Sequence, residues 1–228
     1  MAALLNHAFF SKGNLQFQAS TGIWRFADNQ YDIMRERNWL FSVNNNNFID
    51  LYACGTGDNP IKFSNYREFV DWGNNRVINA GPRRRLWRTL SSDEWTYVFH
   101  ERNTVSGMRF AKAEVCGING VVLFPDDWMN EYYRFNHVNN SLSSFHENII
   151  LETQWLVLEQ SGVVFLPCAG YRGGDSYYGF GSFGGYWSSF HYRSDHAYAL
   201  CFDDSNLNIK KTRYLGLSVR LVYAKDYV

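Results

Sequence analysis

Short apolar runs, each closed by turn residues, restrict the fold of this chain more than any other feature. Residues 8–10, 15–18 and 24–26 have the pattern of strands, and glycine-containing turns at 12–14 and 20–22 separate them. The same pattern predicts further strands at residues 108–115, 121–124, 163–166, 186–189, 197–202 and 218–222. The pattern predicts many short strands joined by turns and loops.

Two helices are expected between these strands. The first spans residues 92–102, where Ser91 and Glu94 have the spacing of a capping box. Its inward face would carry Trp95, Val98, Phe99 and Arg102. The second spans about residues 152–160 and ends at Gly162, and a shorter helix is plausible near residues 65–72. The fold class is therefore α+β, and the lack of a repeat or linker predicts one domain over residues 1–228.

Composition supports a packed core and argues against two classes of partner. Hydrophobic residues make up 46% of the chain and aromatic residues 18%, which is enough for a core with aromatic contact surfaces. The 22 basic and 22 acidic side chains balance, so no net field attracts nucleic acid or an anionic membrane. No segment has the length and apolarity to insert directly into a membrane, and the first ten residues do not resemble a signal peptide.

Cysteine spacing and acidic pairs give no strong sign of a metal or catalytic site. The four cysteines are far apart in the sequence, so we expect free thiols and no zinc site. Asp126 and Asp127 could act as acid and base, but a turn after Pro125 is the simpler interpretation. His191, His196, Asp195 and the pair at 203–204 match no standard metal-ligand spacing. No metal and no cofactor is predicted.

Several sequence strings, taken together, resemble one protein family. In chain order they are FFSKGNLQFQASTGIWRFADNQYD, WRTLSSDEWTYVF, NGVVLFPDDW, GVVFLPCAG, GGYWSS and LGLSVRLV, spanning about residues 9–222. They resemble the variable proteins of diversity-generating retroelements and the related surface domains of gut Bacteroidetes and phages. That family has the C-type lectin fold, in the branch of the formylglycine-generating enzymes. The resemblance implies the same fold here, with a variable ligand-binding region at about residues 186–222.

The family resemblance also implies how binding residues would vary. In the family, a reverse transcriptase mutates adenines in AAC-like codons, which cannot then encode Lys, Glu, Gln, Trp or Met. The seven residues after Ser189 are all reachable from such codons: Phe190, His191, Tyr192, Arg193, Ser194, Asp195 and His196. Aromatic, histidine and arginine side chains are also frequent in recognition surfaces. We expect ligand binding at residues 190–196.

Strand alternation extends this expectation to the following strand. Side chains at 198, 200 and 202 should face the core, and Ala199, Cys201 and Asp203 should face solvent as variable positions. Tyr214 and Leu215, just before Gly216, are further candidates. Lys210 and Lys211 do not fit the codon rule, so we assign them to the scaffold.

The function predicted from these features is binding and not catalysis. The expected partner is a protein or glycan on a target cell surface, and a homo-oligomer is left open. By resemblance the protein would act on a phage virion or a bacterial cell surface. The alternatives are an oxidase of the formylglycine-generating type, which uses two nearby cysteines late in the chain, and a structural virion or surface module. Cys168 and Cys201 are 33 positions apart, as their numbers show, and do not fit that oxidase pattern.

Overall fold

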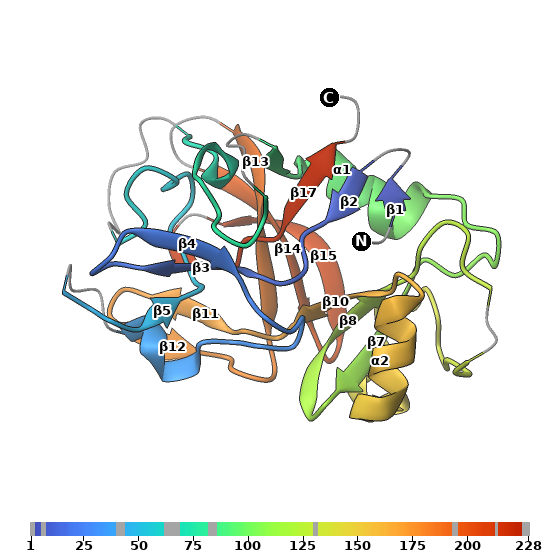
Figure 1. Cartoon of the computed structure of the whole chain (residues 1–228). Coiled ribbons are helices and arrows are strands. Elements are labelled where there is room, and N and C mark those ends of the chain that lie inside the picture. Colours follow the sequence, from blue (N-terminus) through green and yellow to red (C-terminus); the bar gives the residue numbers. More distant parts are fainter. Residues whose placement is uncertain are drawn as a thin grey trace.

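A computed structural model describes residues 3–5, 8–39, 44–61, 69–81, 86–129, 132–192, 196–212 and 214–224. Within these residues the chain forms five small sheets and two short α-helices, which is an α+β architecture (Figure 1). None of the described helices is long and apolar enough to cross a membrane.

The first sheet joins the two ends of the chain. Its order is β1 (Ala3–Leu5), β2 (Ala8–Phe10), β17 (Leu221–Ala224) and β6 (Trp87–Thr89). Figure 1 shows β17, in red, directly beside β2, in blue. The expected strand at 218–222 therefore begins later, at Leu221, and the residues before it form isolated bridges with Tyr52 and Tyr186.

Two further sheets form the sides of the molecule. One has the order β10 (Val164–Pro167), β8 (Ile118–Leu123), β7 (Phe110–Val115) and β9 (Ile149–Ile150). The other has the order β4 (Ile23–Phe26), β3 (Leu15–Gln18) and β5 (Phe48–Ile49). The predicted hairpin through Gly117 is confirmed, since β7 and β8 pair antiparallel on either side of it.

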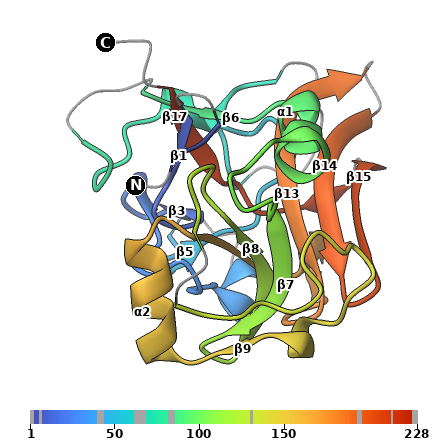
Figure 2. The same cartoon turned by 90° about the vertical axis from the view of Figure 1, so that its right-hand side faces the viewer.

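The remaining two sheets carry the C-terminal part of the chain. β13 (Gly184–Tyr192), β14 (His196–Asp203) and β15 (Asn206–Thr212) form an antiparallel meander, with β15 at the outer edge in Figure 2. β12 (Ser176–Tyr178), β11 (Tyr171–Gly173) and β16 (Leu215–Gly216) form the smaller sheet. Neither β15 nor the β11–β12 hairpin is predicted from the sequence.

The helices agree with the sequence in position but not fully in type. The capping box at Ser91 and Glu94 is present at the start of α1 (Ser92–Thr96). The chain then widens into a π-helical segment, η3 (Tyr97–Glu101), where a continuous α-helix is predicted over 92–102. α2 (Glu152–Gln160) has the predicted bounds. Short 3₁₀ segments are η1 (Arg35–Trp39), η2 (Trp72–Asn74) and η4 (Phe145–Glu147), and most of the predicted helix at 65–72 lies outside the described residues.

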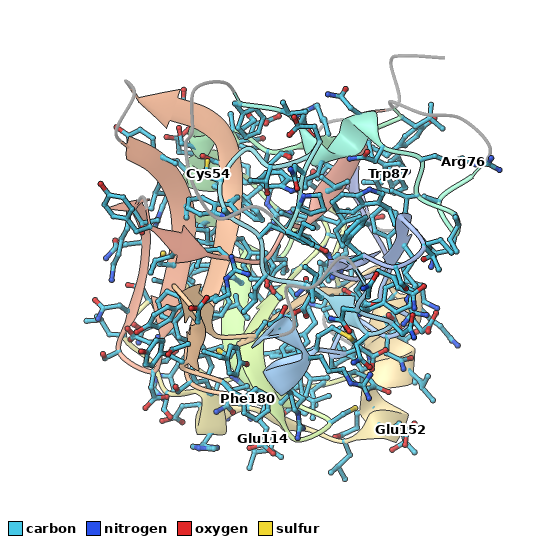
Figure 3. The ribbon with its side chains drawn as sticks, turned by 90° about the vertical axis from the view of Figure 1, so that its left-hand side faces the viewer. Cys54, Arg76, Trp87, Glu114, Glu152 and Phe180 are labelled. Carbon is cyan, nitrogen blue, oxygen red and sulfur yellow. The ribbon has the colours of Figure 1, made fainter. Side chains whose placement is uncertain are left out.

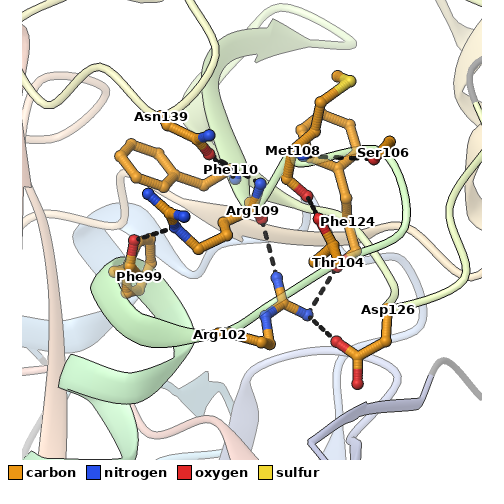
Figure 4. Close-up of polar contacts among 10 residues, drawn as sticks. All are labelled: Phe99, Arg102, Thr104, Ser106, Met108, Arg109, Phe110, Phe124, Asp126 and Asn139. Carbon is orange, nitrogen blue, oxygen red and sulfur yellow. Dashed lines mark hydrogen bonds and ion pairs between the residues drawn. The ribbon is translucent and has the colours of Figure 1, made fainter.

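Arg102, directly after η3, joins the helix to the neighbouring sheet (Figure 4). Its guanidinium is fully buried, donates to the carbonyls of Phe124 at 2.8 Å and Arg109 at 3.0 Å, and pairs with Asp126 at 3.0 Å. Burial raises the pKa of Asp126, and the guanidinium beside it acts in the opposite direction. This geometry agrees with the interpretation of Asp126 as part of a turn, where it partners a buried arginine.

Candidate functional site

The β13–β14–β15 sheet lies between two apolar clusters, and this position defines the candidate site. On one face is cluster A, which includes Trp95, Phe99, Tyr186, Leu200 and Phe202. On the other face is cluster B, which includes Trp24, Tyr52, Trp187, Ala199 and Cys201. Clusters A and B cover both faces of the sheet along its middle. A ligand could therefore contact the sheet only at its ends and turns.

The prediction that two variable positions on β14 are exposed is wrong. Ala199 is 0% exposed and Cys201 is 3% exposed, because cluster B covers the face that the sequence predicts to be open. Burial raises the pKa of the Cys201 thiol to about 12. Leu200 and Phe202 are buried as predicted, whereas Tyr198 is half-buried. Ala199 and Cys201 therefore belong to the frame of the site and cannot contact a ligand in this structure.

Asp203 lies at the wrong end of β14 to join the predicted site. β14 runs from His196 to Asp203, and at about 3.3 Å per residue this separates its ends by roughly 23 Å. The half-buried Asp203 accepts from the Ser205 amide at 2.8 Å in the turn to β15. Burial would raise the pKa of Asp203, but the hydrogen bonds from Ser205 and Asn206 outweigh it and lower the pKa. Its role here is to close a turn.

The other end of the sheet collects most of the remaining predicted residues. In the register of β13 and β14, His191 lies opposite Ala197 and Tyr192 opposite His196. Thr212 at the end of β15 also lies opposite Ala197. Tyr214, two residues further along, is therefore close in the chain to this end and is 70% exposed. Leu215 is half-buried on β16.

The tip of the hairpin itself is only partly described. Phe190, His191, Tyr192 and His196 are placed as strand backbone, and their side chains lie outside the described part of the chain. Arg193, Ser194 and Asp195 lie outside the described residues altogether. We use the name tip for residues 190–196. Among the described residues, no group of three or more His, Cys, Asp or Glu side chains could hold a metal ion.

The strand leading to the tip is held by hydrogen bonds from three directions. The Trp187 indole donates to the Tyr52 carbonyl at 2.7 Å, and the Trp95 indole donates to the Trp187 carbonyl at 3.4 Å. The Ser189 amide donates to the Leu90 carbonyl at 2.7 Å. Each partner comes from a part of the chain far from β13, so bending of this strand would break tertiary contacts.

An irregular register bends β13 just before the tip. Trp187 lies opposite Ala199 and His191 lies opposite Ala197, so four steps on β13 match two on β14. The Ser188 hydroxyl donates to the Tyr198 carbonyl at 2.8 Å within this bulge. Bulges change the direction of a strand and its side chains. Here the bulge separates the buried frame from the tip.

A buried polar network holds the base of the frame. The Tyr186 hydroxyl donates to the Pro167 carbonyl at 2.9 Å, and Asn14 donates to that hydroxyl at 3.4 Å. Fully buried Arg220 donates to the Gln30 side chain at 2.6 Å and to Asn14 at 3.5 Å. Burial lowers the pKa of Arg220 to about 10, so the guanidinium remains charged at neutral pH. Buried groups of this kind are costly to leave unpaired, which favours one arrangement of the surrounding strands.

The cysteines do not form a pair in the structure. Cys54, Cys116, Cys168 and Cys201 are all free thiols, as predicted. Burial raises the pKa of Cys168 well above its usual value and that of Cys54 to about 12. Figure 3 shows Cys54 on the upper part of one side of the molecule. Raised pKa values keep these thiols protonated and poorly nucleophilic at neutral pH.

A second group of exposed aromatic side chains is not predicted from the sequence. Tyr178 is 48% exposed and Phe180 is 38% exposed, on or beside β12. The segment looks like an irregular loop because of its glycines, yet Gly174-Asp175 between two alternating stretches is a signal for a two-residue hairpin. Gly174 has φ +58°, as such a turn requires.

We compared the chain with known protein families, curated proteins and solved structures. No protein-family model, no curated protein and no solved structure matches the chain.

Proposed function

We propose that this protein is a binding module of the C-type lectin type, in which a fixed frame presents a variable tip to a protein or glycan on a cell surface. The observation that carries the proposal is the sharp boundary at the bulge in β13. Before it, Trp187 is fully buried and bonded to Tyr52; beyond it, the strand continues to the tip. Because many tertiary contacts hold the strand before the bulge, substitutions beyond the bulge should leave the fold intact.

The composition of the tip supports recognition more than catalysis. Aromatic rings, two histidines and an arginine within seven residues resemble the residue types of protein-binding loops. Exposed Tyr214 follows the end of β15, which lies in register with the base of the tip. We propose that Tyr214 extends the surface formed by residues 190–196, and that Ala199, Cys201 and Asp203 take no part in it.

We infer the class of partner from the charge and residue types of the chain and from the family resemblance of its sequence. Balanced charge gives no general attraction to nucleic acid, so affinity must come from shape, aromatic contacts and local hydrogen bonds. A phage virion or a bacterial cell surface is the proposed place of action. The ordered sequence strings and the α+β architecture support the C-type lectin fold in this proposal.

Two display libraries would test the separation of frame and tip. In the first library, residues 190–196 and Tyr214 are randomised. In the second, the buried residues Ala197 and 199–202 of β14 are randomised. We expect most members of the first library to stay protease-resistant and some to bind hen egg-white lysozyme, used as a defined test protein. Most members of the second should lose protease resistance because they disrupt clusters A and B.

The comparison between the libraries decides the proposal. Equal loss of folded protein in both would show that the tip is part of the core and would reject the frame-and-tip division. A folded first library without any lysozyme binders would reject the binding function while leaving the structural division intact.

A further inference from the structure

The meander of β13, β14 and β15 has one covered edge and one open edge. On the outer side of β13, the Ser218 amide donates to the Gly185 carbonyl at 2.9 Å, and the Ser189 amide donates to the Leu90 carbonyl at 2.7 Å. On the outer side of β15, no backbone hydrogen bond joins the strand to any other part of the chain that the structure describes. Figure 2 shows β15 at the outer edge of the molecule.

The turn between β14 and β15 fixes which backbone groups of β15 point outward. Asp203 pairs with Asn206 across a two-residue turn, so this first pair exchanges hydrogen bonds. Along the two strands, hydrogen-bonded pairs alternate with pairs that are not hydrogen-bonded. The backbone groups of every second residue, Leu207, Ile209 and Lys211, therefore point away from β14. Each of these residues offers one N–H donor and one C=O acceptor at the open edge.

The side chains of β15 divide between a core face and a solvent face. Leu207 is 2% exposed and Ile209 is half-buried, and both pack against cluster A. Asn208 and Lys210 are exposed on the opposite face. An edge strand of this kind can extend its sheet by one more strand, provided that the added strand has the same division into an apolar and a polar face.

We propose that a second copy of this chain adds its own β15 to this edge, antiparallel, around a two-fold axis at Ile209. Ile209 then lies opposite Ile209 of the other copy, and Leu207 lies opposite Lys211. In this register the residues with outward backbone groups meet one another, so the N–H and C=O groups of all three are paired. The two three-stranded sheets become one continuous sheet across a symmetric dimer.

The lysines favour this register over its neighbours. On the solvent face, Lys210 of each copy lies opposite Asn208 of the other. A register centred on Lys210 would place two ammonium groups directly opposite each other, which destabilises a strand pair. A register centred on Asn208 would place Lys211 opposite Ser205 in the turn, where the strand has ended. Lysine on an edge strand usually discourages unspecific pairing, and here it selects one arrangement.

The two ends of β15 carry opposite charges, which favours a second copy as the occupant. The turn before the strand carries Asp203 and Asp204, and the strand itself ends with Lys210, Lys211 and Thr212. Antiparallel pairing brings the acidic turn of each copy toward the lysine end of the other, whereas parallel pairing would bring lysine to lysine. The turn lies roughly 10 Å along the strands from those lysines, so this attraction is long-range and is weakened by salt.

The proposed interface is small, so the dimer should be weak and reversible. Pairing over residues 207–211 buries less than the roughly 800 Å² per partner of a standard interface. The inference does not rest on the proposed function of the tip, because it uses the backbone edge of β15. If the tip does bind a target, two paired copies would present two tips, and the second contact would raise the overall affinity.

Sedimentation equilibrium over a concentration series at low ionic strength tests the proposal. The average mass of the wild type should rise from the 26.6 kDa of one chain toward twice that value. Asn208→Lys should weaken the dimer by roughly fivefold, and Asn208→Glu should strengthen it by a similar factor. Each change places a charge opposite Lys210 of the other copy, and the two-fold axis makes it act twice.

Two matched changes at a distant position control for net charge. Asn59 is exposed and lies outside the meander, so Asn59→Lys and Asn59→Glu should associate like the wild type. Ile209→Pro removes an outward N–H that makes no bond to β14, so β15 should stay in place on the monomer while the dimer is lost. Circular dichroism checks that this variant folds; if it does not, the pair of changes at Asn208 decides alone.

A wild type that stays monomeric at the highest concentration reached overturns the proposal. Self-association that Asn208→Lys and Asn208→Glu leave unchanged, or shift in the same direction, also overturns it, because another face would then carry the contact. A Gly/Ser replacement of residues 190–196 should keep the dimer. Failure of the tip as a binding site and failure of strand pairing are therefore distinguished.

Discussion

Asp50 shows how one buried carboxyl group couples this fold to pH. It follows β5 and is fully buried, where it accepts from the Asn38 amide at 2.8 Å and the Met34 backbone at 3.1 Å. Burial raises the pKa of Asp50 to about 6, although these hydrogen bonds act in the opposite direction. Asn38 in turn accepts from the Asp50 and Leu51 amides, so the carboxyl group helps to fix η1.

Lower pH should therefore stabilise the folded state through Asp50. Its folded pKa lies above the unfolded value, so its contribution is complete below the unfolded pKa and is lost as pH rises through about 6. Between pH 7.5 and pH 5 the free energy of unfolding should rise by about 1 kcal/mol from this group. Urea unfolding of wild type and Asp50→Asn at both pH values measures it. Parallel pH dependence in the two proteins would contradict the assignment.

Sequence spacing predicts the contacts of a residue well where its partner is near in the chain. The cap at Ser91 depends on Glu94, three residues away, and both are placed as expected. The exposure of Ala199 and Cys201 is wrong for a different reason. Alternation shows that two faces of a strand differ, but the cover on the second face comes from residues such as Trp24 and Tyr52, far away in the sequence.

At the scale of elements, α1 is short and depends strongly on its first turn. Ser91 accepts from the Glu94 amide at 3.1 Å, and Glu94 accepts from the Ser91 amide at 2.8 Å. Arg88 on β6 also pairs with Glu94, which links the helix start to the first sheet. The buried face of the helix carries Trp95, whose indole reaches the carbonyl of Trp187.

Loss of the cap should destabilise the protein by a measurable amount. Ser91→Ala removes the acceptor for the Glu94 amide, and the free energy of unfolding should fall by about 1 kcal/mol. Ser92→Ala is the control, because its hydroxyl makes an exposed contact with Asp93 at 3.4 Å and its replacement keeps the cap. Guanidinium unfolding monitored by tryptophan fluorescence compares the two. Equal losses in both variants would mean that the cap contributes no specific stability.

Elements with apolar periodicity are predictable here, and elements made of polar or glycine-rich residues are not. α2 and the β7–β8 hairpin have clear patterns and occupy their expected positions. β15 alternates Leu207 and Ile209 with Asn208 and Lys210, but two lysines and a polar start weaken the signal. Its strand conformation comes from its seven-residue pairing with β14.

At the scale of the whole molecule, the last strand completes a sheet that the first strands begin. β17 lies between β2 and β6 in the first sheet, so neither neighbour pairs fully until the end of the chain is present. Leu221 and Val222 are fully buried, and they extend clusters B and A respectively. Just before β17, Leu217 and Ser218 bridge to Tyr52 and Tyr186.

This connectivity makes cooperative folding depend on the C-terminal residues. A chain ending at Gly216 lacks β17, which lies between β2 and β6 in the first sheet. It also lacks the Arg220 network and the bridges to Tyr52 and Tyr186. We expect this shortened chain to show no cooperative thermal transition. Tyr223→Ala is the control: it removes the half-buried ring that contacts Trp87 at 5.7 Å but keeps the β17 backbone, so its transition should remain cooperative at a lower midpoint. Circular dichroism melting compares the two. A sharp transition in the shortened chain would contradict this expectation. It would mean that the other sheets fold as a unit without β17 and without burial of Leu221 and Val222.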